Sequence, residues 1–379
     1  IVISNKDFQY LNNTFSKIFF IFCFYLIINS IFSDFSYFSL KSSLFYFRFG
    51  VFSLAIWYLL NNQKDLLSNF LIFLIISFFI GLAAGTYQYI YSETIFGLPN
   101  PSKVHFRLLL LTSDNAILGQ YFSRLLPLLI GLLILKKRFV KIHYFLFFLL
   151  FVSTDLIIFI SGERTALGLL VISSTFIIIF MKRLRLFRLI TIVCSIILIL
   201  IISMYSPKIK ERHIDHTLNQ LGLNEKSEKI YLFSKDHENF IFTSWNMFND
   251  NLIVGVGPNN YRKMCGEIDY GLNEFSCSTH PHNNYIQTLS ELGIFGFIFL
   301  LLAVFYLIKT VLQDFYHYHK NNISYLSDYQ ICLMSCFVCN LWPFFPTLNL
   351  FNGWINIIYF LPIGFYLHSI YTNGSPSNK

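Results

Sequence analysis

A short polar stretch at residues 277–285, CSTHPHNNY, holds the side chains best suited to chemistry in this chain, and Glu291 follows it just before an apolar run. Histidine titrates near neutral pH and is able to accept a hydroxyl proton. His282 and His280 are therefore candidate catalytic residues, with Asn283 and Glu291 in supporting roles. A loop histidine that caps the next helix is one alternative. A metal site is a weaker one, because the two histidines lack a third ligand at a familiar spacing such as H-E-x-x-H.

Arginines near the ends of apolar runs form the second group of candidates. Arg164 lies in SGERTA (161–166), a polar break between two apolar spans. Ionisable groups at membrane depth are costly and indicate function, and the planar guanidinium matches phosphate oxygens. An interfacial arginine that reaches lipid headgroups is the alternative. Arg107 and Arg124 flank the fourth predicted span, and Arg124 is deep enough to need a partner, for which Asp155 and the neighbourhood of Arg48 are candidates. A structural ion pair and a substrate contact both remain open for Arg124.

A glycine-containing segment at 255–262, GVGPNNYR, resembles a nucleotide motif only in part. Pro258 follows Gly257 directly, a third glycine is absent, and no βαβ pattern surrounds the segment, so it is not a dinucleotide fingerprint. We interpret it as a tight turn at Gly257 that brings Asn260 and Arg262 near the histidines.

The composition indicates which elements must position these residues. Of the 379 residues, 55% are hydrophobic and 13% are charged, whereas a soluble domain carries about a quarter charged residues. The protein is therefore predicted to be an integral membrane protein. Its net charge of +8 comes from basic residues between apolar runs, which is the positive-inside pattern rather than a nucleic-acid surface. The sequence begins with Ile1 rather than Met, which leaves open whether a segment precedes it.

The apolar runs predict an all-α, polytopic transmembrane helical bundle of about ten spans, or up to 12 if neighbouring spans have been merged, with one long loop. The spans that we identify are 17–33, 44–61, 66–91, 115–135, 142–160, 165–181, 189–205, 292–309, 326–343 and 354–371. The chain then divides into N-terminal transmembrane helices (1–205), the large loop with the histidines (206–291), and C-terminal transmembrane helices (292–379). We do not predict an oligomeric state.

Two dense basic clusters set the predicted orientation. Residues 136–141 and 182–188 are separated by two spans, so both are expected on the cytoplasmic side. The turn at 161–165, the loop 206–291 and the polar connections 92–114 and 343–353 then all face the opposite side. That side has no supply of ATP or nucleotide sugars, so a group transfer there needs a donor that is already activated and membrane-borne. Cys265 and Cys277 lie in the long loop, where an oxidising compartment makes a disulfide between them plausible.

Taken in order, these segments resemble the O-antigen ligase and O-antigen polymerase superfamily of bacterial envelope proteins. The resemblance covers roughly residues 105–310 and rests on SGERTA (161–166), Trp245 to Asn251, GVGPN (255–259), HPHNNYIQ (280–287) and ELGIFG (291–296). It implies a metal-independent, cofactor-free, inverting glycosyltransferase in the bacterial inner membrane, with its active site on the periplasmic face. By motif position, Arg164 would hold the diphosphate of the donor and His282 would assist the acceptor hydroxyl.

The resemblance also implies the partners. The donor would be a glycan linked to undecaprenyl diphosphate, and the acceptor of a ligase would be lipid A-core. A polysaccharide polymerase or a protein O-oligosaccharyltransferase of the same superfamily is the alternative. The remaining outer arginines, Arg107, Arg124 and Arg262, are further candidates for the diphosphate. A lipid or polysaccharide transporter is the alternative from another class, and it would need charged residues distributed through the spans.

Overall fold

The computed structural model of the protein describes residues 8–97, 107–109, 117–136, 140–223, 230, 231, 233–267, 269–271, 273 and 276–372. Within these ranges every helix and turn follows the predicted all-α class, and no strand occurs. Seven helical segments are long and apolar enough to cross a membrane, which confirms a polytopic membrane protein. Lys137 and Arg138 of the first basic cluster, and the polar residues 112–115, lie outside the described residues.

Each of the ten predicted spans falls on a helix. These helices are α1 (Thr14–Ile31), α3 (Phe47–Asn62), α4 (Leu66–Tyr91), α5 (Leu118–Ile134), α6 (Lys141–Ile160), α7 (Arg164–Phe180), α8 (Arg185–Tyr205), α13 (Asn284–Asn321), α14 (Asp328–Leu341) and α15 (Gly353–Thr372). Among them, α5, α7 and α14 have 17, 17 and 14 residues, so they are the short members of the bundle. The remaining elements are η1 (Phe8–Tyr10), α2 (Ser36–Ser43), α9 (Pro207–Lys210), η2 (Glu211–Asp215), α10 (His216–Gln220), α11 (Lys235–Asp250) and α12 (Tyr261–Met264).

Helix α13 differs most from its predicted bounds. It begins at Asn284, inside the predicted loop, because the Asn283 side chain accepts the free backbone N–H groups of Tyr285 and Ile286. At Gly293 the backbone leaves the helical region, with φ 62° and ψ −166°, a conformation that only glycine adopts readily. The first part of α13 therefore extends the histidine segment as a helix, and the apolar span continues beyond the kink.

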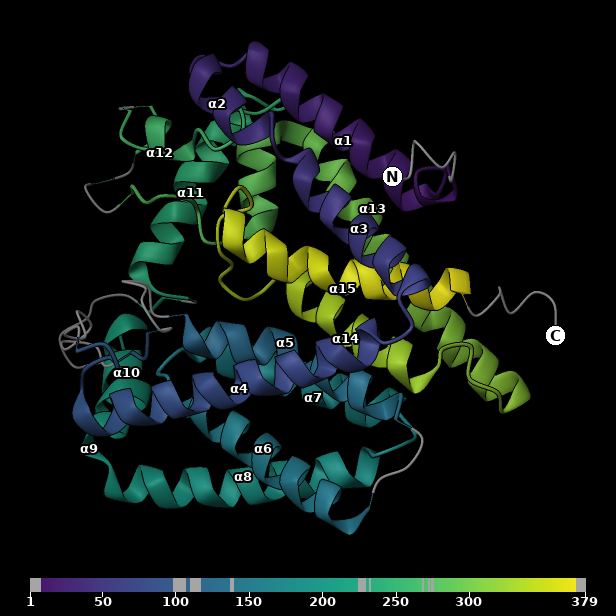
Figure 1. Ribbon diagram of the computed structural model, residues 1–379. Helices are drawn as coiled ribbons and strands as arrows, with labels where there is room; N and C mark the ends of the chain where they lie inside the picture. Colours follow the sequence, from purple (N-terminus) through teal and green to yellow (C-terminus); the bar gives the residue numbers. More distant parts are fainter. Residues whose placement is uncertain are drawn as a thin grey trace.

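The connections of the bundle gather at two ends. In Figure 1 the short helices α9 to α12 lie at the left, and the last turns of α15 lie toward the right. We call the left side the loop end and the right side the basic end. Hydrogen bonds hold the basic end together: the Arg183 guanidinium donates to the backbone carbonyls of Ile134 and Lys136 at 2.8 and 2.9 Å, and Asp328 accepts from the backbone N–H of Arg183 at 2.7 Å. The residues of the two predicted basic clusters that the structure describes thus share one end.

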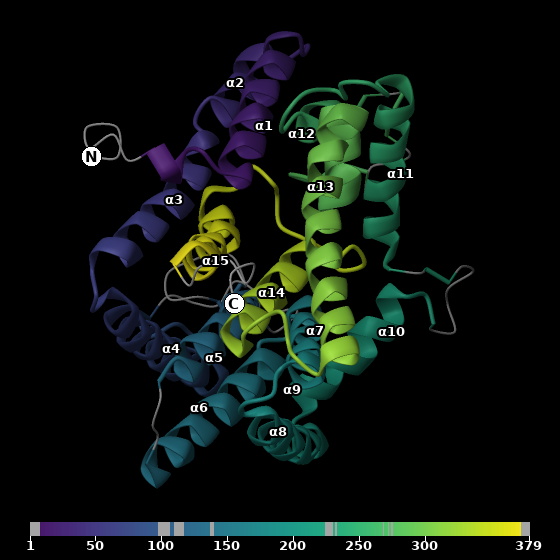
Figure 2. The same cartoon turned by 90° about the vertical axis from the view of Figure 1, so that its right-hand side faces the viewer.

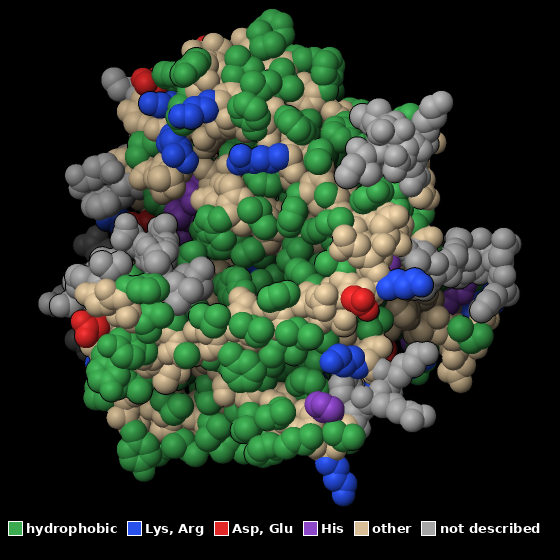
Figure 3. All heavy atoms as spheres, in the orientation of Figure 1, with side chains coloured by type: hydrophobic (Ala, Val, Ile, Leu, Met, Phe, Trp, Pro, Cys, Tyr) green, Lys and Arg blue, Asp and Glu red, His purple; other side chains and the backbone are tan. Residues whose placement is uncertain are grey.

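Burial is uneven across the bundle. Nearly every side chain of α5 is buried, because α4, α6, α7 and α14 surround it, whereas most side chains of α8 are exposed apolar residues. Helix α11 packs along α13 at the loop end (Figure 2). In Figure 3 hydrophobic side chains cover much of the visible face, and Lys and Arg appear mainly toward its margins. This distribution fits a bundle whose flanks contact lipid and whose polar chemistry lies at the ends.

Candidate active site

The turn between α6 and α7 organises one half of the site. The Ser161 carbonyl accepts a hydrogen bond from the backbone N–H of Leu108 at 3.1 Å. The Glu163 carboxyl accepts one from the backbone N–H of Gly119 at 2.6 Å, at the start of α5. A Cβ on Gly119 would lie 2.5 Å from the Ser161 hydroxyl, so only glycine fits this approach. The segments that contain Leu108 and Gly119, which both precede α6 in the sequence, therefore pack against the turn that carries Arg164.

A third segment reaches the same turn and brings Arg212, a residue that the sequence analysis missed. Arg212 lies in η2 and is 3% exposed. Its Nε donates to the Gly162 carbonyl at 2.8 Å, while its Nη2 is buried without a hydrogen-bonding partner. Buried polar atoms without partners are rare in folded proteins. The only sequence signal for Arg212 is its place a few residues beyond the apolar run of α8.

Arg164 and Arg107 lie close to Arg212, and we call these three residues the arginine group. The Arg164 guanidinium donates to the Thr217 hydroxyl at 2.9 Å and to the side-chain carbonyl of Gln220, both on α10. Burial, and then the charges of Arg107 and Arg164, lower the pKa of Arg212 to about 10. Arg212 therefore still carries its proton at neutral pH, and the group concentrates positive charge at the loop end.

Two members of the arginine group have no carboxylate in direct contact. In the described ranges neither Arg164 nor Arg212 forms an ion pair with Asp or Glu. Burial raises the pKa of Glu163 to about 8 despite the opposing effects of its hydrogen bond from Gly119 and the charge of Arg107. At neutral pH the Glu163 carboxyl is therefore largely protonated, so it does little to balance the charge of Arg164 and Arg212.

Arg124 has a different environment. Its guanidinium donates to Gln120 at 3.1 Å, to the Asn340 side chain at 2.9 Å and to the Cys339 carbonyl at 3.2 Å, and it lies 4.9 Å from the centre of the Tyr359 ring. These contacts join α5 to the end of α14. The sequence analysis named Asp155 as one possible partner, but Asp155 does not contact Arg124 in the structure.

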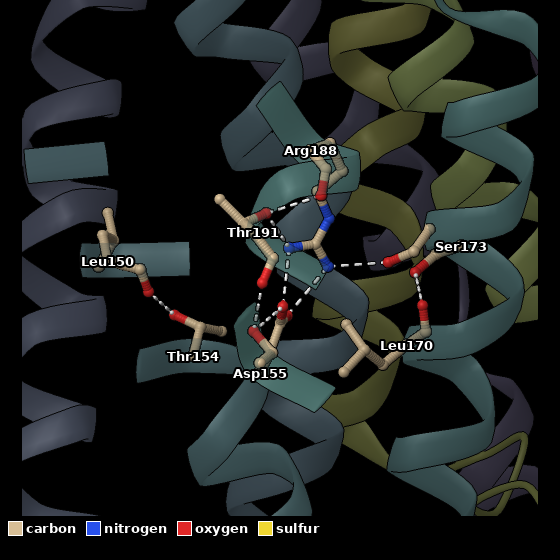
Figure 4. Close-up of polar contacts among 9 residues, drawn as sticks. Leu150, Thr154, Asp155, Leu170, Ser173, Arg188 and Thr191 are labelled. Carbon is tan, nitrogen blue, oxygen red and sulfur yellow. Dashed lines mark hydrogen bonds and ion pairs between the residues drawn. The ribbon is translucent and has the colours of Figure 1, made fainter. Parts of the chain in front are cut away.

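Asp155 pairs instead with Arg188, as Figure 4 shows. Both carboxylate oxygens accept from the guanidinium at 2.9 Å, and the two side chains are almost fully buried. Ser174 accepts a further bond from Arg188, and Ser195 donates to Asp155. Sequence analysis had counted Arg188 only as part of a basic cluster that sets orientation. Its side chain actually lies inside the bundle, where it joins α6, α7 and α8.

The histidine segment forms the other half of the site, and the structure separates the roles of its two histidines. Both ring nitrogens of His280 are occupied: Nε2 lies 3.1 Å from the Thr347 carbonyl and must donate to it, so Nδ1 accepts from the Thr279 hydroxyl at 2.9 Å. Burial lowers the pKa of His280 to about 4. His280 is thus a neutral, fully bonded ring that fixes the segment against the 343–353 connection.

His282 is the more available of the two. Its Nε2 lies 3.2 Å from the Ser278 hydroxyl, and its ring centre lies 4.0 Å from that of His280. Its backbone adopts φ 59°, a left-handed conformation that non-glycine residues avoid, and such strain is often found at functional sites. Burial, and then the charges of His280, His237 and Arg107, lower the pKa of His282 to about 3. His282 is therefore neutral at physiological pH.

The predicted supporting residues hold the histidine segment in place. Asn283 caps α13 and donates from Nδ2 to the Pro343 carbonyl at 2.8 Å. Glu291 accepts from the backbone N–H of Tyr261 and from the Gln287 side chain, each at 2.9 Å. These contacts connect α13 to the glycine turn and, through Asn283, to the chain that follows α14.

Gly257 begins a tight turn in which its carbonyl accepts the backbone N–H of Asn260 at 3.2 Å, and Arg262 lies beyond this turn on α12. Gly257 has φ 103° and donates its backbone N–H to the Glu291 carbonyl at 2.9 Å. A Cβ at this position would come within 2.4 Å of Ser33. Arg262 lies on α12 with an exposed side chain, and its charge contributes to the lowered pKa of His280.

A disulfide holds the chain segment that precedes the histidines. Cys265 and Cys277 are joined, with 5.1 Å between their Cα atoms. The Tyr261 hydroxyl donates to the Ser276 carbonyl at 2.6 Å beside the bond. The disulfide that the sequence analysis considered plausible therefore ties α12 to the segment that precedes His280.

Electrostatic effects link the two halves. The charge of Arg107 lowers the pKa of His282, and the charges of Arg164 and Arg107 lower that of His237, whose ring lies 5.5 Å from the ring of His282. A neutral His282 ring thus lies within the electrostatic reach of the arginine group. Throughout the described ranges, no set of three or more His, Cys, Asp or Glu residues is placed to hold a metal ion.

Comparison with protein families agrees with this geometry. Residues 145–301 match the family model described as O-antigen ligase. The matched segment runs from α6 into α13, so it contains Arg164, Arg212 and the histidine segment. No curated protein matches the chain. The family match supports the resemblance that the motifs predicted: residues 145–301 of this multi-pass membrane protein are similar to the O-antigen ligase family.

Proposed function

We propose that this protein transfers a glycan from undecaprenyl diphosphate to an acceptor hydroxyl at the loop end of the bundle, on the periplasmic face of the bacterial inner membrane. The observation that carries the proposal is the buried Nη2 of Arg212, which has no partner and lies beside Arg164 and Arg107. A diphosphate supplies the oxygens and the negative charge that this group lacks. The family match supports the same class of enzyme.

The proposed reaction uses the two halves of the site in one displacement. The acceptor oxygen attacks the anomeric carbon of the donor, and its proton passes to His282. As this bond forms, the bond from the anomeric carbon to the diphosphate oxygen breaks and leaves its electron pair on that oxygen. The arginine group stabilises the developing charge, an effect that is strong in a preorganised, water-poor site. Attack from the side opposite the diphosphate inverts the anomeric centre.

The predicted site residues take distinct parts in this proposal. His282 is the base, and His280 positions it because both nitrogens of His280 already have partners. Arg164 and Arg212 contact the diphosphate, while Arg107 adds charge. Arg124 joins α5 to α14 and has a structural part in this proposal. Arg262 has an exposed side chain on α12, and in this proposal it meets the acceptor.

The acceptor that we favour is lipid A-core, which makes the protein an O-antigen ligase. Growth of a lipid-linked glycan or transfer to a protein hydroxyl would use the same donor and the same base. The arginine group thus supports the choice of a diphosphate-linked donor. The acceptor is identified by offering different acceptors to the protein.

The test is transfer in proteoliposomes that contain purified protein and an undecaprenyl-diphosphate-linked glycan. Lipid A-core, a second lipid-linked glycan and a serine-containing peptide are offered in separate reactions. We expect a glycosidic product with the first acceptor, and none with a His282→Ala variant. His319→Ala, on α13 near the basic end, is the matched control and should retain activity. Movement of labelled lipid without any glycosidic product would contradict the proposal and favour a transporter.

A further inference from the structure

His237 lies against the histidine segment and within the electrostatic reach of the arginine group. It lies in the first turn of α11, next to the capping residue Ser234. Its ring centre lies 5.5 Å from that of His282, at an interplanar angle of 75°. Phe240, one turn further along α11, lies 5.6 Å from the same ring. The start of α11 therefore packs two rings against the base that we propose, and one of these rings is able to form hydrogen bonds.

The contacts of Ser234 determine which nitrogen of His237 is free. The Ser234 hydroxyl oxygen caps α11 by accepting the backbone N–H of His237 at 3.3 Å, and it lies 2.7 Å from Nδ1 of the same residue. Among the described residues the Ser234 hydroxyl has no other acceptor, so we assign its proton to the bond with Nδ1. The ring proton of His237 then resides on Nε2. In the described part of the chain, Nε2 of His237 has no hydrogen-bonding partner, so the ring presents an unused N–H donor.

The charges around His237 keep this donor neutral. Burial lowers its pKa from the ordinary value, Asp236 opposes this effect, and Arg164 and Arg107 lower the pKa further. His237 therefore lies within the electrostatic reach of the arginine group while its ring contacts His282. The Ser234 hydroxyl and the His282 ring are the other polar groups against it.

We propose that His237 contacts the donor substrate, with its Nε2–H hydrogen-bonded to the diphosphate oxygen that leaves the sugar. This inference rests on the proposed function. In the displacement that oxygen gains the electron pair of the breaking bond to the anomeric carbon. His237 donates a hydrogen bond to it without giving up its proton, while the arginine group holds the remaining phosphate oxygens. The proton of the acceptor still passes to His282.

Three substitutions separate hydrogen bonding from packing. His237→Phe keeps an aromatic ring against His282 but has no N–H, His237→Gln keeps an N–H donor but loses the ring, and His237→Ala loses both. Each variant is assayed in the proteoliposome system over a series of acceptor concentrations that reaches saturation, which gives both kcat and the KM for the acceptor. Loss of one preorganised donor of this kind lowers kcat by about 100–1,000-fold. We expect that loss in the Phe and Ala variants, a partial recovery in the Gln variant, and an unchanged KM for the acceptor.

The outcomes decide the inference independently of the proposed function. A His237→Phe variant as active as the wild type would overturn it, as would a Gln variant no better than the Phe variant. Should the Ala variant fail to fold, the comparison of Phe with Gln still decides. If the wild-type protein forms no glycosidic product, it is the proposed function that fails. The His319→Ala control shows whether handling alone reduces activity.

Discussion

Two regions of this bundle bury guanidinium groups, and they differ in what surrounds the charge. Arg188 meets the Asp155 carboxylate at 2.9 Å through two nitrogens, with hydroxyl groups around the pair. Arg212 donates to one backbone carbonyl and has a buried nitrogen without a partner among the described residues. Burial and then the charges of two other arginines lower its pKa, and Glu163 is the smaller, opposing influence. A charge that serves the fold is matched within the protein. A charge that lacks its match in the protein is suited to a ligand that brings the negative charge.

The same contrast extends to the carboxyl groups. Asp155 has Arg188 against both oxygens. Glu163 instead accepts a backbone N–H, and burial raises its pKa to about 8. The loop end thus keeps Glu163 largely uncharged at neutral pH. Because neither Arg164 nor Arg212 forms an ion pair in the described ranges, both are able to bind the proposed diphosphate.

The largest expected effect comes from breaking the matched pair. Asp155→Ala leaves Arg188 buried without its counter-charge, which costs about 3–5 kcal/mol of folding free energy. We expect a large fall in Tm of the purified protein in detergent and a low yield of folded protein in membranes.

The control for this pair is the double variant Asp155→Leu with Arg188→Met, which removes both charges. Replacing a buried ion pair by apolar side chains is often neutral or stabilising, so the double variant should recover most of the Tm. If Asp155→Ala were as stable as the wild type, the ion pair between Asp155 and Arg188 would not stabilise the fold as its contacts indicate.

The second prediction concerns the unmatched side. Arg212→Gln should lower glycan transfer by about 100–1,000-fold, because one preorganised charge donor to the leaving group is lost. Its Tm should stay near that of the wild type, since no counter-charge is left unpaired. Inorganic diphosphate should raise the Tm of the wild type and have a smaller effect on the variant. A fall in Tm comparable to that of Asp155→Ala would erase the distinction between the two regions.

The sequence predicted the helices well but the partners of the arginines poorly, and the reason is physical. A membrane span is specified by a local run of apolar residues, so all ten predicted ranges fall on helices. The partner of a charge is set by how helices pack, which a single sequence does not display. Asp155 was therefore considered for Arg124 although it pairs with Arg188.

Arg212 and His237 show the same limit within the loop. Neither lies in one of the polar motifs that marked Arg164 or His282, and both reach the site only because η2 and α11 fold back onto the spans. The motif residues were found because polar types cluster beside apolar runs. Their division into a base and a positioning residue needed the contacts of His280 with Thr347.

The third prediction is a loss of stability on acidification that depends on the histidines. His280 and His282 have pKa values of about 4 and about 3 in the folded protein, well below the ordinary value near 6.5. Between these limits the unfolded chain binds protons that the folded protein does not, so folding stability is full above pH 6.5 and falls as the pH decreases. Tm should decline from pH 7 to pH 4.5, and less so for His282→Gln. Equal declines in both proteins would contradict the assignment of a neutral His282.

The smallest expected effect comes from Glu163→Gln, and it tests the contrast most directly. If Glu163 is mostly protonated at neutral pH, an amide that still accepts the Gly119 N–H removes little charge, and the change in stability should stay within about 1 kcal/mol. Transfer activity near pH 7 should change by only a few-fold. Because the pKa of Glu163 is raised in the folded protein, its contribution to stability is present at low pH and is lost as the pH rises through about 8. Between pH 6 and pH 9 the Tm of the Gln variant should therefore fall less than the Tm of the wild type. If the Gln variant instead had a much lower Tm than the wild type at pH 7, Glu163 would be a counter-ion of the arginine group, as Asp155 is for Arg188.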